Sequence, residues 1–165
     1  MMARLFGKFL REDGRQVPIL AATSGDTGSA VAHAFHKIPG VQVIVLFPLD
    51  EVSESQRKLM TTLKDNIRTV AIDGKFDDCQ AMVKQAFADP DLKHIPLSSA
   101  NSINISRLLP QSVYYFYAAS RVAQAGEPVV FAVPSGNFGD MMGAIVAREM
   151  GLPVRKIVAA VNDND

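Results

Sequence analysis

Residues 17–28 have the sequence VPILAATSGDTG, in which an apolar run leads into a loop of small polar residues and glycines. The run from Val17 to Ala22 predicts a buried β-strand, and the residues from Thr27 to about Lys37 have helical spacing. A strand that passes through a glycine-rich loop into a helix is the repeating unit of parallel α/β folds. This stretch therefore predicts an α/β protein.

The same alternation continues along the chain on both sides of this stretch. Apolar runs rich in β-branched residues predict strands at residues 41–47, 67–72, 129–133 and 155–161, with a weaker one at 95–99. Helical spacing predicts helices at residues 2–10, 53–63, 76–88, 103–124 and 138–150, of which Pro110 kinks or divides the one at 103–124. The helix at 53–63 opens with a capping box formed by Ser53 and Gln56.

We expect these elements to form a doubly wound, mostly parallel sheet with helices on both faces, a three-layer α/β/α arrangement. It should be a single domain over residues 1–165, because no linker or repeat interrupts the pattern. The strands at 17–22, 41–47, 67–72 and 129–133 should be parallel neighbours in that sheet.

The composition argues against several function classes. Lysine plus arginine total 17, as do aspartate plus glutamate, so no basic excess favours nucleic acid. The longest apolar runs are far shorter than the ~20 residues that a membrane span needs. Cys79 is the single cysteine, which suits a reducing compartment. His33 and His36 have no acidic or cysteine partner nearby, so no metal site is expected. The sequence predicts a cytoplasmic protein without metal, nucleic acid or membrane contact.

Two loops rich in glycine and small polar residues follow predicted strands, at residues 22–28 and 134–140. Ligands of open parallel sheets bind beyond the carboxyl ends of the strands, where such loops lie. Each loop could present backbone N–H groups to an anion at a helix N-terminus, or it could be a tight turn with a helix cap. Neither has the spacing of a dinucleotide or nucleoside-triphosphate loop. Two anion-ready loops suggest a ligand with two separated anionic groups.

Residues 98–107 form a third polar segment, which ends in Arg107. An arginine fork there could hold a phosphate together with Asn101 and Ser102. A helix cap followed by an exposed arginine would explain the segment equally well.

Three motifs occur in order: A-T-S-G-D-T-G at residues 22–28, A-N-S-I-N-x-x-R at 100–107 and P-S-G-N-F-G-D at 134–140. Together they resemble the threonine synthase family, of the tryptophan-synthase-β-like (fold type II) pyridoxal-phosphate enzymes. The resemblance covers residues 23–165. It implies a lyase of threonine biosynthesis that converts O-phospho-L-homoserine and water into L-threonine and phosphate, with pyridoxal 5'-phosphate as cofactor.

The resemblance also implies roles for individual residues. Asp26 would lie beside the ring hydroxyl of the cofactor, where relatives have asparagine. The positions that would receive the cofactor's phosphate are Gly136, Asn137, Phe138 and Gly139. Those that would hold the substrate's carboxylate are Thr23, Ser24, Gly25 and Thr27, and those that would hold its phosphate are Asn101, Ser102 and Arg107.

The sequence departs from the family pattern in one respect that matters for catalysis. The family's Schiff-base lysine lies in an F-K-D motif before the first helix, and we expect no catalytic residue within these 165 residues. Lys8 does not replace it, because it lies in mid-helix. The chain is therefore expected to be a fragment that binds the cofactor non-covalently at best and that could self-associate through its truncated face.

Two alternatives remain at this point. A serine/threonine dehydratase or cysteine synthase relative would share the fold, but it would have no substrate phosphate for the segment from Asn101 to Arg107. A non-catalytic module that binds a phosphorylated ligand would use the same loops without the chemistry.

Overall fold

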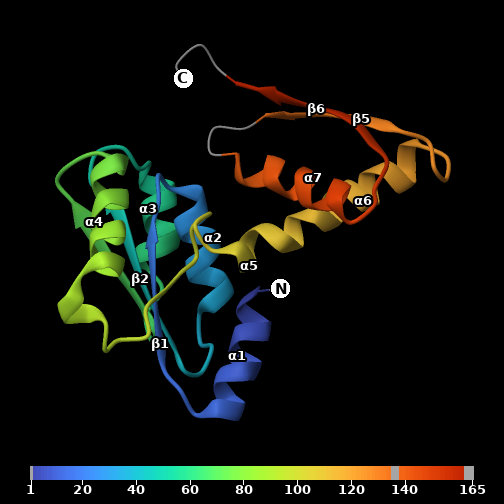
Figure 1. Cartoon of the computed structure of the whole chain (residues 1–165). Helices are drawn as coiled ribbons and strands as arrows, with labels where there is room; N and C mark the ends of the chain where they lie inside the picture. Colours follow the sequence, from blue (N-terminus) through green and yellow to red (C-terminus); the bar gives the residue numbers. More distant parts are fainter. Residues whose placement is uncertain (1, 135–137, 162–165) are drawn as a thin grey trace. The chain divides into compact units, whose positions relative to one another are not determined.

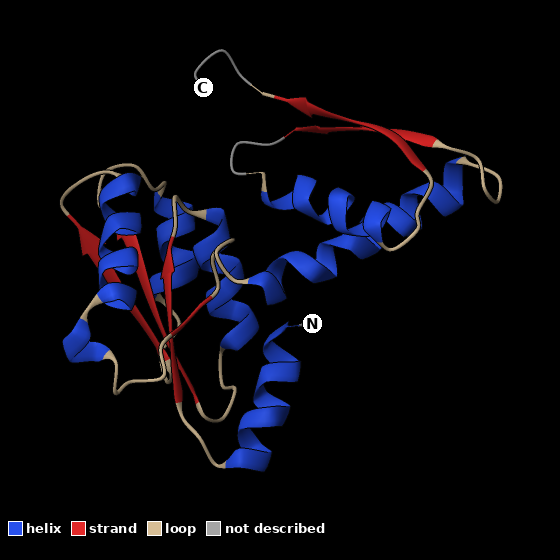
Figure 2. Cartoon of the chain, viewed as in Figure 1, coloured by secondary structure: helices blue, strands red, loops and turns tan. Residues whose placement is uncertain are grey.

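The computed structural model describes residues 2–134 and 138–161 and divides into two compact units, Met1–Asn101 and Ser102–Asp165 (Figure 1). Each unit has its own sheet (Figure 2). The expected single domain over residues 1–165 stays a prediction.

The first unit contains a four-stranded parallel sheet in the order β3-β2-β1-β4. Its strands are β1 (Val17–Ala22), β2 (Val41–Pro48), β3 (Ile67–Ile72) and β4 (Ser98–Ser99). Its helices are α1 (Met2–Asp13), α2 (Asp26–Phe35), α3 (Glu54–Thr61) and α4 (Phe76–Ala88), followed by the short 3-10 turn η1 (Pro90–Leu92). These bounds agree with the expected elements to within a few residues.

Alternate side chains of β1 enter different cores, which gives the first unit its three layers. Ile19 and Ala21 are fully buried against α1, α2 and α3, whereas Leu20 and Ala22 are buried with Cys79 of α4 on the other face. Helices therefore cover both faces of the sheet, as Figure 2 shows for this unit. The expected α/β/α architecture is confirmed here.

The second unit contains two parallel strands, β5 (Val129–Pro134) and β6 (Val154–Ala160). Its helices are α5 (Ile105–Leu108), α6 (Ser112–Val122) and α7 (Gly139–Glu149), with a 3-10 turn η2 (Leu109–Gln111) between the first two. Pro110 therefore divides the expected helix, because its ring removes a backbone donor. Tyr115, Val133 and Ala144 belong to the core of this unit.

One expectation about the sheet is wrong. Residues 129–133 form a parallel strand, but β5 pairs with β6 in a separate two-stranded sheet and does not join β1, β2 and β3. Composition identifies a buried strand, whereas its partner is fixed by contacts between residues far apart in the sequence. No helix in the described residues is long and apolar enough to cross a membrane.

Candidate cofactor and substrate site

The loop after β1 is organised around the side chain of Thr23. Its hydroxyl oxygen accepts hydrogen bonds from the backbone N–H groups of Gly25 (2.9 Å) and Gly28 (2.7 Å). The side chain is buried, with 1% exposure. Because this hydroxyl accepts from the loop's own backbone, and the N–H of Thr23 donates to the carbonyl of Leu46 at 3.0 Å, the main role of Thr23 is to shape the loop.

Two glycines allow the loop to fold this tightly. Gly25 has φ 138°, a conformation open to glycine, and a Cβ there would lie 2.5 Å from the amide carbon of Gln56. A Cβ on Gly28 would lie 2.3 Å from Cγ2 of Thr23 and 2.6 Å from the sulfur of Met60. Neither position therefore has room for a larger side chain.

Helix α2 begins directly after this loop and leaves donors at its N-terminus. Within the described part of the chain, no atom accepts a hydrogen bond from the backbone N–H of Asp26 or of Thr27. Unpaired amides in a first helical turn attract a carboxylate or phosphate. Ser24 and the carboxylate of Asp26 are exposed beside them.

A hydrogen bond from α3 orients the Asp26 side chain. Nε2 of Gln56 donates to Oδ1 of Asp26 at 2.7 Å. The predicted capping box is confirmed, since Ser53 caps α3 and Gln56 returns to its backbone. Sequence reasoning identified Gln56 only as part of this cap. Its bond to Asp26 joins residues on different helices, and no local pattern indicates it.

Asn101 lies beside the same loop and binds backbone atoms of Ala22. Its Oδ1 accepts from the N–H of Ala22 at 2.9 Å, and its Nδ2 donates to the carbonyl of Ala22 at 2.7 Å. This pairing continues the β1–β4 contact two residues beyond Ser99. One N–H of the amide is left for a ligand. The structure thus gives Asn101 an anchoring role that the sequence did not indicate.

The remaining predicted site residues lie in the second unit. Gly136 and Asn137 fall outside the described residues. Phe138 caps α7 in a left-handed conformation with φ 56°, and Gly139 is the buried first residue of that helix. This is the strand–loop–helix order expected of a phosphate-binding loop.

Ser102 and Arg107 are half-buried in the second unit. Arg107 lies in α5, and its carbonyl accepts from the side chain of Gln111. Desolvation lowers the pKa of the Arg107 guanidinium from its usual value. A partly desolvated arginine binds an oxyanion more strongly than an exposed one.

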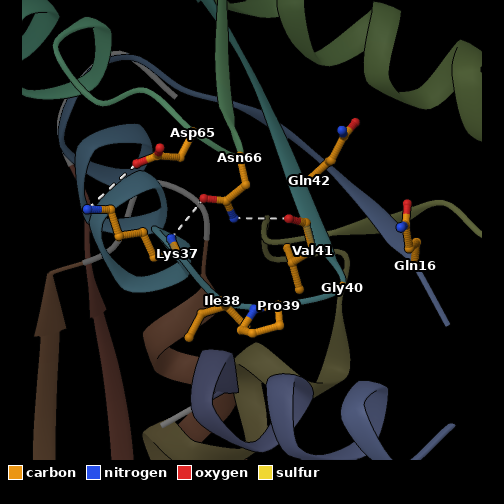
Figure 3. A pocket seen from close by; sticks show the side chains of 9 residues that line it. All are labelled: Gln16, Lys37, Ile38, Pro39, Gly40, Val41, Gln42, Asp65 and Asn66. Atoms are coloured by element: carbon orange, nitrogen blue, oxygen red, sulfur yellow. Dashed lines mark hydrogen bonds and ion pairs between the residues drawn. The ribbon is translucent and has the colours of Figure 1, made fainter. Parts of the chain in front are cut away.

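The opposite, amino edge of the first sheet contains a cavity of about 350 Å³ (Figure 3). Some of its polar groups bind one another: Asn66 accepts from the N–H of Lys37 at 2.8 Å and donates to the carbonyl of Val41 at 3.0 Å. The Lys37 ammonium lies 3.8 Å from the Asp65 carboxylate. Asn66, Lys37 and Asp65 are therefore already engaged with neighbouring groups in this cavity. In the described residues, no group of three metal-ligating side chains occurs.

The fold and the carboxyl-edge loop define an α/β protein with donors for an anionic ligand at helix N-termini. Residues 1–164 match the family described as "Pyridoxal-phosphate dependent enzyme", and the chain belongs to that family. Pyridoxal phosphate is the family's cofactor.

The chain is similar to several threonine synthases, both in sequence and in structure. The chain is 56% identical to threonine synthase of Escherichia coli over 153 residues, 92% of this chain and 36% of that protein. It is 53% identical to threonine synthase of Serratia marcescens over 99% of this chain and 38% of that protein. The crystal structure of the E. coli enzyme matches with a TM-score of 0.85, and that of pyridoxal-phosphate-bound threonine synthase from Brucella melitensis with 0.84.

The chain spans little more than a third of the length of these relatives, 36% of the E. coli protein and 38% of the S. marcescens protein. The described residues fit the family's cofactor chemically. Pyridoxal phosphate carries a phosphate and an aromatic ring with a hydroxyl, and the chain supplies helix N-termini for an anion and a polar side chain, Asp26, at the exposed edge of the loop.

Proposed function

We propose that this chain forms part of a threonine synthase, which converts O-phospho-L-homoserine and water into L-threonine and phosphate in the cytoplasm. The observation that most strongly supports this proposal is the 56% identity to the E. coli enzyme over 92% of the chain, which includes the whole loop after β1. The unpaired amides of Asp26 and Thr27 support the proposal, because the substrate carries both a carboxylate and a phosphate.

The loop after β1 would bind the substrate's carboxylate. Ser24 and Thr27 would meet it with backbone N–H groups and with their hydroxyls, and Gly25, which has no side chain, would let it approach the loop closely. Thr23 would hold the loop in the receptive shape through its hydroxyl, which accepts from Gly25 and Gly28. Asp26 would orient the ring hydroxyl of the cofactor.

The second unit would supply the phosphate contacts. Gly136, Asn137, Phe138 and Gly139 would receive the cofactor's phosphate at the N-terminus of α7. Ser102 and Arg107 would hold the substrate's phosphate until it leaves, the role that the family resemblance also gives to Asn101. Arg107 would neutralise the charge that builds on the departing phosphate, and its partial burial strengthens that effect.

The bound cofactor would supply the electron-withdrawing ring that stabilises negative charge on the substrate's carbon atoms. We propose that the lysine that binds it covalently does not belong to these 165 residues. The isolated chain would then bind the cofactor weakly and make no threonine. Apolar side chains such as Val113, Tyr114 and Val122 are exposed in the isolated chain, which supports self-association there.

The test replaces Arg107 with alanine in an enzyme completed with the remaining segments of a threonine synthase. Loss of a charged contact to a buried phosphate should lower kcat/KM for O-phospho-L-homoserine by roughly 30- to 1,000-fold and leave cofactor affinity unchanged. Arg121→Ala is the matched control, because Arg121 is exposed and lies over the ring of Tyr117. Unchanged turnover, or loss of cofactor in place of substrate, would refute the assignment.

A further inference from the structure

We propose that Gln56 is a positioning residue for the Asp26 carboxylate, in addition to its role in capping α3. The inference rests on the proposed function, in which Asp26 lies beside the ring of the cofactor. A residue of α3 thereby sets the direction of that carboxylate.

A single side-chain amide makes contacts in two directions. On one side, Oε1 of Gln56 accepts from the backbone N–H of Ser53 at 3.2 Å and from its hydroxyl at 2.9 Å. On the other side, Nε2 donates to Oδ1 of Asp26 at 2.7 Å. The bonds to Ser53 fix the plane of the Gln56 amide, so the N–H groups on Nε2 point in a fixed direction on the opposite side. That direction leads to Asp26.

The backbone of the loop depends on the same side chain. The side-chain amide of Gln56 occupies the space where a Cβ of Gly25 would lie. A Cβ built on Gly25 would be 2.5 to 2.7 Å from the amide carbon, oxygen and nitrogen of Gln56. Gly25, with φ 138°, is therefore packed against the group that binds its neighbour Asp26. Helix α3 supports both the backbone and the side chain of the loop.

The identity of the residue separates the two roles. Glutamate serves a capping box as well as glutamine does, because both accept from the backbone with a side-chain oxygen. At this position, however, glutamate would bring a second carboxylate to the oxygen of Asp26 and would have no N–H to donate. Capping alone does not require glutamine, whereas orientation of Asp26 requires a donor.

Three variants of the full chain distinguish the roles when pyridoxal phosphate is titrated and followed by NMR on the backbone amides of Asp26 and Thr27. Ser53→Ala weakens the cap but keeps the bond to Asp26. Gln56→Glu keeps the cap but loses that bond. Gln56→Met loses both without adding charge. Thermal unfolding of each protein measures the capping contribution independently.

We expect both Gln56 variants to weaken pyridoxal phosphate binding by about threefold to tenfold, the effect of losing one hydrogen bond to a charged group at an exposed site. Ser53→Ala should lower thermal stability and leave affinity within about twofold. The double variant Asp26→Asn with Gln56→Glu restores a donor–acceptor pair of the same total charge, and it should recover most of the affinity. Equal affinity for wild type and Gln56→Met, or equal weakening by Ser53→Ala and Gln56→Met, would overturn the proposal.

A second readout does not depend on the cofactor. In the ligand-free protein, the side-chain amide protons of Gln56 should shift and lose protection from exchange when Asp26 is replaced by alanine. If those signals do not change, the pair does not form and the inference is wrong. If they change while the wild-type protein binds no pyridoxal phosphate, the proposed function fails and the positioning of Asp26 stands.

Discussion

A side-chain amide lies at each of the two edges of the first sheet, and the two amides have different roles. At the amino edge, the side-chain amide of Asn66 bonds to the N–H of Lys37 and the carbonyl of Val41, as Figure 3 shows. It also donates to the carbonyl of Phe35, so all its partners among the described residues are backbone atoms. At the carboxyl edge, the amide of Gln56 binds a carboxylate, that of Asp26, which is itself exposed. One amide closes a turn, and the other directs a charged group.

The contrast extends to the donors around each amide. At the amino edge, Asn66 bonds to the backbone N–H of Lys37, whose backbone has φ 60°. At the carboxyl edge, the amides of Asp26 and Thr27 have no acceptor among the described residues. Unsatisfied donors at a helix N-terminus suit an anionic ligand.

The largest expected effect comes from filling the space beneath the carboxyl-edge loop. Gly28→Ala places a methyl group within 2.3 Å of buried Thr23 and 2.6 Å of buried Met60, so we expect a loss of about 3–5 kcal/mol in the free energy of unfolding. Urea denaturation measures it. Ser29→Ala, one residue further along α2, is the control, and a loss for Gly28→Ala no larger than for this control would contradict the packing described.

Next in size is Thr23→Val, which keeps the shape of the side chain and removes the acceptor for two buried backbone N–H groups. We expect a loss of about 2–3 kcal/mol, because neither donor gains a new partner. Thr23→Ser retains the hydroxyl and should be destabilised less, by about 1 kcal/mol from the lost methyl group. Equal losses in the two variants would show that the hydroxyl does not hold the loop.

Asn66→Ala tests the amino edge. It removes three hydrogen bonds to backbone atoms, but water can reach these atoms through the cavity, so the expected loss is about 1–2 kcal/mol. Gln42 lines the same cavity with an exposed side chain. Gln42→Ala should therefore lower the free energy of unfolding by less than about 0.5 kcal/mol. Neither variant should change cofactor affinity. A change in that affinity would mean that the two edges are coupled.

The smallest effect that we expect is the covalent labelling of lysines by pyridoxal phosphate. When the chain is mixed with pyridoxal phosphate and reduced with borohydride, mass spectrometry should find only low labelling spread over several exposed lysines, since surface amines react transiently without a site. Stoichiometric labelling of one lysine, together with threonine formation, would show that the catalytic lysine belongs to these 165 residues.

Local features of the fold were predictable from the sequence. Apolar runs and helical spacing predicted the strands and helices of the first unit, and the Ser53–Gln56 pair predicted the cap of α3. These signals depend on residues close together in the chain. The partner of β5 was not predictable, because strand pairing depends on contacts between distant segments.

The candidate site divides in the same way. The loop after β1 was found from its glycines and its place after a strand. The bond from Gln56 to Asp26 and the pairing of Asn101 with Ala22 join different elements and leave no periodic signal. Asn66 lies in a short turn that no motif marks, although its side chain closes the amino edge. Such long-range bonds from amide side chains require a structure.

The most direct test of the central claim is the map of backbone amide NMR shifts when the chain is titrated with pyridoxal phosphate. The claim is that the ligand binds at the carboxyl edge of the first sheet and not at its amino edge. The amides of Asp26 and Thr27 should shift most, and those of Lys37, Gly40 and Asn66 should stay within noise. Shifts confined to Lys37, Gly40 and Asn66 would contradict the account and place the ligand in the cavity at the amino edge.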